Sequence, residues 1–334
     1  MPKAKAIRIR EPGGPEVLEV GEIEVPAPGP SEVLIEVAAA GLNRADCLQR
    51  RGFYPAPPGV PADVPGLEFA GVVESVGGSV STWKPGDRVM GIVAGGAMAT
   101  SVRTEAAELM SVPKELSLEE AAAVPEVFLT AYDAIVLQGG LQSGQTVLVH
   151  AIASGIGTAA IQIAAVLGAT SVGTSRTAHK LPRCADLGLT HAVLVEEGEF
   201  AETVLAAVPK GANVILDTVG AAYLAQNVKV IAKKGHIIVI GLMGGVKGEL
   251  NLGALLAKRA SIHGSVLRSR SAAEKAELTK SFTDEMLNRF ATGELKPIID
   301  DVLPMTDIQT AHHRMDANET FGKLVLTWGT RSPS

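Results

Sequence analysis

The sequence predicts an α/β protein in which a doubly wound parallel sheet is joined to a second, β-rich domain. From about Ser117 onward, short apolar segments alternate with helical segments, as in the strand–helix repeats of parallel sheets. The first third of the chain instead shows short alternating segments between dense turn signals. The length of 334 residues suits two domains of about 100–200 residues each.

Composition excludes several classes of protein. Hydrophobic residues make up 46% of the chain and charged residues 20%, which excludes a disordered protein. The net charge is −6 and no block of lysine and arginine occurs, so nucleic acid is not expected as a partner. Cys47 and Cys184 are too few for a disulfide scaffold or a four-thiolate zinc site. Charges interrupt the first eight residues, so we expect no signal peptide and a cytoplasmic location.

One long uncharged stretch, residues 134–175, has the composition of a membrane-spanning segment. Glutamines, glycines and His150 interrupt it. A buried strand, turn, helix and strand of a parallel sheet produce the same pattern, because such strands are covered on both faces. We therefore expect no membrane span.

The elements follow from periodicity and turn signals. Alternation predicts strands at Lys5–Ile9 and Glu32–Val37, and Lys84–Arg88 indicates a turn that leads into a strand, so the first third is expected to be an irregular or barrel-like β domain. Ser117 and Glu120 form a capping box ahead of an alanine-rich helix. Further strands are expected at Thr146–His150, Thr170–Thr174, Ala192–Val195, Val214–Asp217, Ile237–Ile240, Ser261–Val266 and Lys323–Thr327. Further helices are expected at Gly157–Leu167, Ala178–Leu187, Phe200–Val208, Ala222–Ile231, Ala254–Lys258, from Arg270 through Phe290, and at Asp307–Ala317.

The turn after the first of the parallel strands has the context of a dinucleotide site. An apolar strand enters a turn of small residues and then a helix, whose first backbone N–H groups bind pyrophosphate in such folds. The usual glycine pattern is poorly kept, because Ile152 and Ser154 stand at its first two glycine positions. The alternative is a tight strand–helix turn without a ligand. The residues expected to contact the cofactor here are Ser154, Gly155, Ile156 and Gly157.

The choice of cofactor follows from the end of the next strand. An acidic residue there would bind the ribose of NAD, but no acid occurs before Asp186. Ser175 can instead donate to a 2′-phosphate, and Arg176 and Lys180 can neutralise it. NADPH is therefore the expected cofactor. The alternative is that both cations are solvated charges at a helix start.

Several segments together carry a family resemblance. Gly41–Asp46, Gly66–Gly71 and Ala123–Ala131, with the dinucleotide turn, resemble the medium-chain dehydrogenase/reductase superfamily. Within it the chain is most similar to the zinc-free quinone oxidoreductase (zeta-crystallin) branch and its tumour-protein-inducible NADPH-dependent subgroup. The resemblance implies a GroES-like catalytic domain over residues 1–120 and 268–334 and a Rossmann NADP-binding domain over residues 121–267. It also implies a homodimer and a nicotinamide held in the cleft between the domains.

The zinc-dependent alcohol dehydrogenases of this superfamily bind a catalytic zinc through Cys, His and Cys. At the matching positions this chain has Asn43, Leu67 and Glu126, which do not form a zinc site, and the lobe for structural zinc has no counterpart. No metal is therefore expected, and alcohol oxidation is not expected either. A hydride site without a Lewis acid suits an acceptor that is already electrophilic, such as a quinone.

Three residues are the catalytic candidates. Asn43 can donate to the substrate or the nicotinamide ribose, or it is simply a helix N-cap. Asp46, three residues later on the same helical face, can orient that network, or it only satisfies backbone donors or pairs with an arginine. Tyr54 can cap the cleft or donate to the substrate oxygen, or it is loop packing.

The resemblance also assigns further cofactor contacts. The competing interpretations are that Leu267 belongs to the core and that Arg268 forms an interface ion pair. The subgroup has a tyrosine near the adenosine phosphate where this chain has Val195. The further contacts are Thr130, Gly241, Leu242, Met243, Leu267, Arg268 and Asn318.

The expected function is a zinc-independent NADPH:quinone oxidoreductase that acts on small quinones, with ortho-quinones favoured. One alternative is an NADPH-dependent enone or alkenal reductase, which needs a proton delivered to carbon. The other is an NADPH-binding protein with a non-catalytic role.

Overall fold

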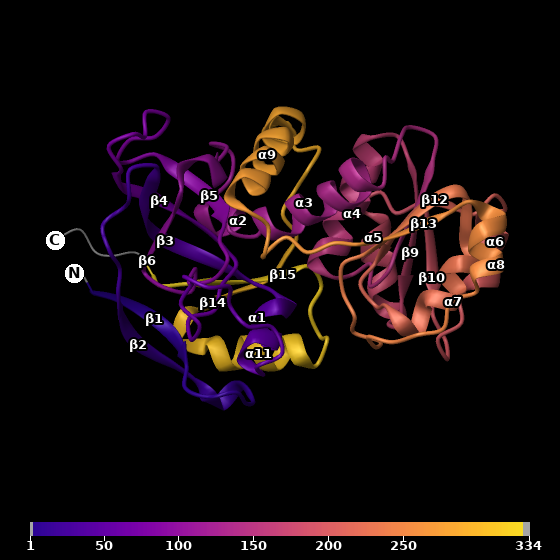
Figure 1. Cartoon of the computed structure of the whole chain (residues 1–334), viewed down its shortest axis with the longest axis horizontal. Coiled ribbons are helices and arrows are strands. Elements are labelled where there is room, and N and C mark those ends of the chain that lie inside the picture. The colour runs from indigo at the N-terminus through magenta and orange to yellow at the C-terminus, as the bar shows by residue number, and fades with distance from the viewer. Residues whose placement is uncertain (1–2, 330–334) are drawn as a thin grey trace. The chain divides into compact units, whose positions relative to one another are not determined.

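The computed structural model describes residues 3–329, and its chain divides into two units. Unit 1 consists of Met1–Leu129 and Leu267–Ser334, and unit 2 consists of Thr130–Val266. The first and the last segments that the structure describes therefore both belong to unit 1, as the indigo and yellow elements of Figure 1 show.

Unit 1 is built on a seven-stranded sheet and a two-stranded sheet. The larger sheet has the order β14-β15-β3-β4-β5-β7, with β6 paired to β3, and β1 pairs with β2 in the smaller one. β15, near the end of the chain, lies antiparallel to β3, which fixes the carboxy-terminal segment in this unit. The strands are β1 (Lys3–Ile9), β2 (Leu18–Glu24), β3 (Glu32–Leu42), β4 (Glu68–Val76), β5 (Arg88–Ile92), β6 (Ser101–Glu105), β7 (Leu109–Ser111), β14 (Ile299–Pro304) and β15 (Lys323–Thr327).

The helices of unit 1 confirm most of the predicted segments. The predicted capping box is present: Glu120 N donates to Ser117 Oγ at 3.1 Å, and Ser117 N donates to Glu120 Oε2 at 2.8 Å. The helix predicted from Arg270 through Phe290 contains a π-helical turn at Thr283–Leu287. The helices are α1 (Arg44–Arg50), α2 (Leu118–Ala121), α3 (Pro125–Tyr132, which continues into unit 2), α9 (Ala272–Phe282), α10 (Asn288–Ala291) and α11 (Ile308–Asp316), with 3-10 turns at Pro15–Val17, Ala106–Glu108 and Met305–Asp307.

Unit 2 contains a six-stranded sheet in the order β10-β9-β8-β11-β12-β13, and every neighbouring pair is parallel. From β8 the chain adds β9 and β10 toward one edge of the sheet, and it then crosses back to add β11, β12 and β13 toward the other edge. The direction in which strands are added therefore reverses between β8 and β11. Ligands bind at such a switch point in doubly wound sheets. The predicted doubly wound sheet is confirmed. The strands are β8 (Thr146–Val149), β9 (Thr170–Ser175), β10 (His191–Leu194), β11 (Ala212–Asp217), β12 (Ile231–Val239) and β13 (Ser261–Gly264).

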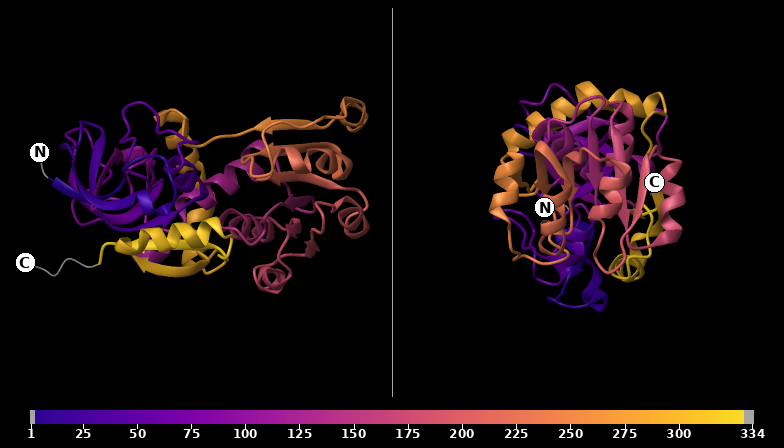
Figure 2. Two further views of the ribbon diagram at one scale, coloured as in Figure 1. Left: turned by 90° about the horizontal axis from the view of Figure 1, so that it is seen from below. Right: turned by 90° about the vertical axis from the view of Figure 1, so that its right-hand side faces the viewer.

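Helices lie on both sides of this sheet (Figure 2). A buried cluster packs α6 and α7 against the strands, and it includes Leu148, Ile215, Phe200 and Val204. The prediction of a single helix at Ala178–Leu187 is wrong, because a 3-10 turn at Ala178–Lys180 precedes α5. Pro182 in α5 has no N–H with which to continue an earlier helix. The helices are α4 (Gly155–Val166), α5 (Leu181–Ala185), α6 (Ala201–Ala207), α7 (Ala221–Val230) and α8 (Leu252–Lys258), with a π-helical segment at Asp133–Gln138.

The uncharged stretch 134–175 is divided among the π-helical segment, β8, α4 and β9. Within residues 3–329, every helix falls short of the length and apolar character that a membrane crossing requires.

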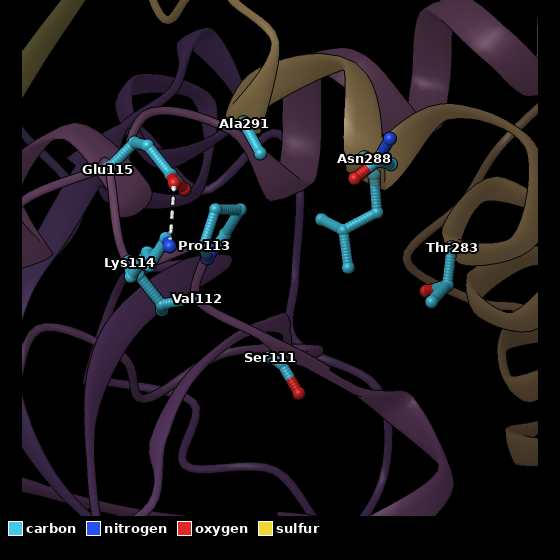
Figure 3. Close-up of a pocket in the computed structure, with 9 residues that line it drawn as sticks. Ser111, Val112, Pro113, Lys114, Glu115, Thr283, Asn288 and Ala291 are labelled. Atoms are coloured by element: carbon cyan, nitrogen blue, oxygen red, sulfur yellow. Dashed lines mark ion pairs between the residues drawn. The ribbon is translucent and has the colours of Figure 1, made fainter.

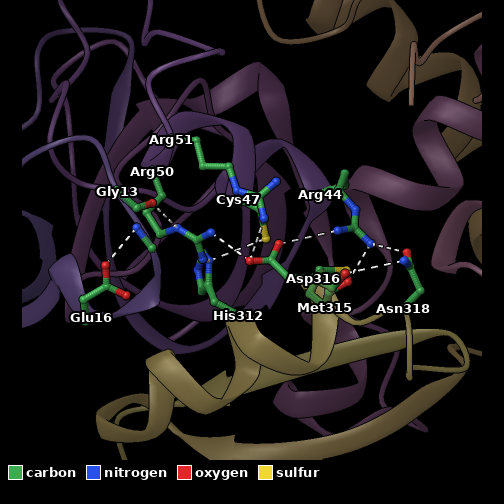
Figure 4. A network of polar contacts seen from close by, with 11 residues as sticks. Gly13, Glu16, Arg44, Cys47, Arg50, Arg51, His312, Met315, Asp316 and Asn318 are labelled. Carbon is green, nitrogen blue, oxygen red and sulfur yellow. Dashed lines mark hydrogen bonds and ion pairs between the residues drawn. The ribbon is translucent and has the colours of Figure 1, made fainter. Parts of the chain in front are cut away.

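A buried arginine ties α1 to α11 in unit 1 (Figure 4). Arg50 is 1% exposed, and its guanidinium donates to Asp316 Oδ2 at 2.8 Å and to His312 Nδ1 at 3.0 Å. His312 therefore accepts at Nδ1 and is neutral, and burial together with Arg50 lowers the pKa of His312 from 6.5 to about 3. Its neighbour His313 is exposed, so the two adjacent imidazoles lie in different surroundings.

Cys47 belongs to the same part of unit 1. It is fully buried in a cluster with Leu42, Ala311 and Leu324, and burial raises the pKa of its thiol to about 12. Cys47 is thus a packed, unreactive thiol.

We expect His312→Gln to change how stability depends on pH. The unfolded chain binds a proton at His312 below about pH 6.5, whereas the folded chain does so only near pH 3. The free energy of unfolding of the wild type therefore falls as the pH is lowered through this window. Glutamine keeps an acceptor for Arg50 and does not titrate. Urea unfolding at pH 7 and pH 5 should show a smaller loss for the variant, and equal losses would contradict the assignment.

Candidate active site

The catalytic candidates lie in unit 1, where α1 starts directly after β3. Asp46 is fully buried, and both of its oxygens accept from backbone: Oδ2 from Asn43 N at 2.8 Å and Oδ1 from Gly66 N at 2.8 Å. Gly66 has φ +107°, and a Cβ there would lie 2.5 Å from Met98 N, so only glycine fits. Burial, against these two N–H groups, raises the pKa of Asp46 to about 6. Asp46 thus satisfies backbone donors and fixes the approach to α1.

The side chain of Asn43 belongs to a buried charge cluster. Asn43 Nδ2 donates to Glu68 Oε1 at 2.9 Å, and Asn43 Oδ1 accepts from Lys323 Nζ at 2.7 Å. Lys323 Nζ also donates to Glu68 Oε1 at 2.5 Å and to the carbonyl oxygen of Leu42 at 2.7 Å. We call Asn43, Glu68 and Lys323 the buried triad. The Lys323 ammonium thus has three acceptors. Asn43 is the N-cap residue of α1, and its side chain forms hydrogen bonds within the triad.

The second oxygen of Glu68 holds the start of α3. Glu126 N donates to Glu68 Oε2 at 2.8 Å, so the carboxylate satisfies one of the N–H groups that a helix start leaves free. Space for this carboxylate depends on Gly41, because a Cβ there would lie 2.4 Å from Glu68 Oε1 and 2.7 Å from the carbonyl oxygen of Ala122. β3, β4, β15 and α3 therefore converge on one buried group.

Glu126 differs from the other acids of this region. Its side chain is partly exposed, and within residues 3–329 its carboxyl group has neither a hydrogen bond nor an ion pair. Burial and the neighbouring Glu68 carboxylate raise the pKa of Glu126 to about 8, against the opposing charge of Lys323. At neutral pH this carboxyl group carries its proton.

Tyr54 is positioned by Arg268. The guanidinium carbon of Arg268 lies 4.9 Å from the centroid of the Tyr54 ring, and Arg268 Nη1 donates to the carbonyl oxygen of Tyr54 at 3.0 Å. The same guanidinium donates to Gln49 Oε1 at 2.7 Å and to the carbonyl oxygen of Ala94 at 2.6 Å. The buried Arg268 side chain thus holds the loop of Tyr54 in place. Burial raises the pKa of the Tyr54 hydroxyl.

The dinucleotide turn lies in unit 2, between β8 and α4. Ser154 is the N-cap, its Oγ accepting from Gly157 N at 3.1 Å. Ser154 N donates to the carbonyl oxygen of Ala151, whereas the amides of Gly155 and Ile156 have no acceptor among residues 3–329. A Cβ on Gly157 would lie 2.3 Å from the carbonyl oxygen of Ile152. Two free amides and a close backbone approach at a helix start fit a bound pyrophosphate.

A buried network of hydrogen bonds lies directly before this turn, at the end of β8. His150 Nδ1 lies 2.8 Å from Thr174 Oγ1, and His150 Nε2 lies 2.7 Å from Asn227 Oδ1. Asn227 Nδ2 donates to Asp217 Oδ2 at 3.0 Å. Since Asn227 Oδ1 can only accept, His150 carries its proton on Nε2 and accepts from Thr174. One neutral imidazole thus links β8, β9, β11 and α7 at the carboxyl end of the sheet.

The predicted phosphate residues follow β9. The Ser175 hydroxyl accepts from Thr177 N at 3.0 Å and is 7% exposed. Arg176 is exposed, whereas Lys180 is 8% exposed. The charge of Arg176 also reaches Tyr223, whose ring packs against His150 at 4.8 Å between centroids. An aromatic hydroxyl from α7 therefore lies near Arg176, in a chain that has Val195 instead of the subgroup's tyrosine.

The remaining predicted cofactor residues are spread over both units. Gly241 follows β12 in unit 2 and donates its N–H to the carbonyl oxygen of Asp217, and the side chains of Leu242 and Met243 are exposed. Thr130, on α3, is partly exposed. In unit 1, Leu267 is buried, and Asn318 Oδ1 accepts from Arg44 Nη2 at 2.8 Å (Figure 4).

Sequence reasoning missed Glu68 and Lys323 as members of the site. Each is a single charge beside an apolar strand segment, at Leu67–Gly71 and Leu324–Leu326, and this was the available signal. Gln49 was missed as well, since nothing in the sequence links it to Arg268.

In the part of the chain that the structure describes, neither a metal-binding cluster nor the cavity described next involves the predicted site residues. Within residues 3–329, no group of three or more His, Cys, Asp or Glu side chains is arranged to hold a metal ion. A cavity of about 350 Å³ in unit 1 is lined by Pro113, Leu287 and Ala291 beside the Lys114–Glu115 ion pair (Figure 3). It contains none of the predicted site residues.

Known proteins resemble the chain over nearly its whole length. The alcohol dehydrogenase GroES-like domain family matches residues 29–114, and the zinc-binding dehydrogenase family matches residues 155–283. The quinone oxidoreductase of Homo sapiens is 30% identical, over 96% of this chain and 97% of that protein. The chain belongs to the medium-chain dehydrogenase/reductase superfamily.

Two further members of the superfamily are similar. The synaptic vesicle membrane protein VAT-1 homolog of Homo sapiens is 30% identical, over 91% of this chain and 81% of that protein. The structure of Escherichia coli quinone oxidoreductase complexed with NADPH has a TM-score of 0.87 and 29% identity, over 97% of this chain and 100% of that one. The fold is thus that of the oxidoreductases of this superfamily, with a GroES-like unit and a Rossmann-like sheet.

We expect Lys323→Met to destabilise this superfamily member by about 3–5 kcal/mol, because it leaves the Glu68 carboxylate buried and unpaired. The double variant Glu68→Gln/Lys323→Met should regain most of that loss, since it removes both charges. Urea unfolding of the three proteins tests this. A single variant as stable as the wild type would show that the triad is not a buried ion pair in solution.

Proposed function

We propose that the protein is a zinc-independent NADPH:quinone oxidoreductase. The observation that carries the proposal is the bonding of the Asn43 side chain. Asn43 stands at a position that matches a zinc ligand of the alcohol dehydrogenases. Both polar atoms of its side chain are bonded within the buried triad. A site that places an asparagine and an ammonium here, with no group of side chains within residues 3–329 arranged to hold a metal ion, suits an acceptor that needs no Lewis acid. The similarity to quinone oxidoreductases supports this substrate class.

The dinucleotide, when bound, supplies the hydride. Ser154, Gly155, Ile156 and Gly157 would hold its pyrophosphate, and the free amides of Gly155 and Ile156 support this assignment. Ser175, Arg176 and Lys180 would bind the 2′-phosphate. The further contacts that we propose from the resemblance are Thr130, Gly241, Leu242, Met243, Leu267, Arg268 and Asn318.

On the substrate side we assign different roles to the three catalytic candidates. Asn43 and Asp46 are positioning residues, because their polar atoms are bonded within the protein. Tyr54 is the candidate for substrate contact, because its ring is held by Arg268 and its side chain is partly exposed. The substrate is a small quinone, with ortho-quinones favoured.

A homodimer in the cytoplasm completes the proposal. β13 is an edge strand of the six-stranded sheet, and an unpaired edge tends to pair with another strand. Exposed apolar side chains lie on α8 and near this edge: Leu252 is 68% exposed, Leu256 78% and Val266 49%. A second copy of the chain would cover both features.

The first test of the function is oxidation of NADPH by the chelator-treated protein with 1,2-naphthoquinone, 1,4-benzoquinone and a 2-alkenal. We expect quinone turnover that the chelator does not change. Turnover with the alkenal alone would favour an enone reductase. NADPH binding without turnover of any acceptor would favour a non-catalytic binding protein.

The assignment of the phosphate site predicts a selective defect. Arg176→Ala/Lys180→Ala should raise the KM for NADPH about tenfold or more and leave the KM for NADH nearly unchanged, because only NADPH carries the 2′-phosphate. Steady-state kinetics with both cofactors measures this. Equal changes for both cofactors would show that these cations do not recognise the phosphate.

The dimer predicts that Leu252→Glu/Leu256→Glu produces monomers, because four charges would be buried at the interface of two copies. Light scattering after gel filtration gives the mass. A wild type that is already monomeric would refute the dimer.

A further inference from the structure

We propose that Glu126 is the proton donor of the reaction and gives its carboxyl proton to the carbonyl oxygen of the bound acceptor. The inference deepens the proposed function and rests on it. The sequence alone presented Glu126 only as a poor substitute for a zinc ligand. Its surroundings in unit 1 give it another chemistry.

The backbone of Glu126 is fixed. It is the second residue of α3, after Pro125, and its amide donates to Glu68 Oε2 at 2.8 Å. Glu68 in turn is fully buried and bonded to Lys323 and Asn43. The buried triad therefore positions the helix turn from which the Glu126 side chain projects.

The carboxyl group of Glu126 is available to a ligand. Asp46 uses both oxygens on backbone amides, and Glu68 uses both on the triad and on α3. Within residues 3–329, the Glu126 carboxyl has no hydrogen-bonding or ion-pair partner, although it is only partly exposed. A half-buried carboxyl without a partner is rare in proteins, and a substrate oxygen would satisfy it.

Its surroundings keep the proton on this carboxyl at neutral pH. Glu68 on β4 and Asp46 on α1 face it and disfavour the carboxylate, as burial does, whereas Lys323 on β15 and Arg268 favour it. Tyr54 also lies within electrostatic reach and is uncharged at this pH. The N-terminus of α3 favours an anion by about 0.3–1 kcal/mol, which is too little to reverse the balance. The pKa of about 8 suits a general acid near neutral pH.

The step balances as a two-electron reduction. The quinone takes up a hydride from the dihydronicotinamide, which amounts to two electrons and one proton. Its carbonyl oxygen takes the second proton from the Glu126 carboxyl as charge develops on that oxygen. The products are hydroquinone and the oxidised dinucleotide. The Glu126 carboxylate then regains a proton from water.

The test is the pH dependence of kcat for 1,2-naphthoquinone with saturating NADPH. For the wild type we expect kcat to fall as the pH rises through about 8, because the proton is lost from Glu126. Glu126→Gln should lower kcat at pH 7 about 100-fold and remove this decline. Glu126→Asp should keep the decline at a reduced rate, since it keeps a titrating carboxyl. Glu119→Gln, at an exposed glutamate on α2, is the matched control and should behave as the wild type.

Thermal unfolding and NADPH titration of each variant separate loss of the step from loss of the fold, and Glu126→Asp carries the test if Glu126→Gln does not fold. An unchanged kcat and pH profile in Glu126→Gln would overturn the inference. So would a wild-type kcat that rises through pH 8, which would make the carboxylate the active form. A wild type that reduces no quinone would instead overturn the proposed function.

Discussion

The ion pair between Lys323 and Glu68 is the interaction on which the rest of unit 1 depends. Its partners come from β15 and β4, which are far apart in the sequence, and both charges are almost fully removed from water. Such burial costs several kcal/mol per ion unless further hydrogen bonds compensate it. Here Asn43, the carbonyl oxygen of Leu42 and the amide of Glu126 complete the set. The pair therefore specifies where β3, β15, α1 and α3 meet, more than it stabilises the fold.

The same arrangement gives three neighbouring acids three different states. Glu68 is paired with a cation, Asp46 is held by two backbone amides, and the carboxyl group of Glu126 has no hydrogen-bonding or ion-pair partner within residues 3–329. Burial raises the pKa of Asp46 only to about 6, because both amides favour its anion, whereas Glu126 reaches about 8 beside the Glu68 charge. Environments that separate the pKa values of neighbouring carboxyls are typical of acid–base sites. Removing the triad would therefore alter the protonation of Glu126 as well as the packing.

The sequence predicted what depends on local pattern. Strand–helix alternation, the Ser117 capping box and the turn at Ser154–Gly157 all follow from residues close together in the chain. The triad does not, because Lys323 lies 255 residues from Glu68 and no local rule pairs them. For Asn43 and Asp46 the sequence left a functional and a structural reading open. The structure shows that their polar atoms are bonded within the protein. This could not be derived from the sequence, because Glu68 and Gly66, which provide bonds to them, are distant in the chain.

The weak glycine pattern of unit 2 has a physical explanation. The turn needs one left-handed residue, and Ala151 supplies it with φ 50°. It needs one position without a Cβ, and that is Gly157, which lies against the carbonyl of Ile152. The side chain of Ile152, where the pattern has its first glycine, fits because Gly173 on β9 has none: a Cβ there would lie 2.4 Å from Ile152 Cγ1. Ser154, at the second glycine position, caps α4 with its hydroxyl, and the amides of Gly155 and Ile156 have no acceptor in the part of the chain that the structure describes. The space for Ile152 thus comes from a glycine on the neighbouring strand, which a search for spaced glycines within the turn segment does not detect.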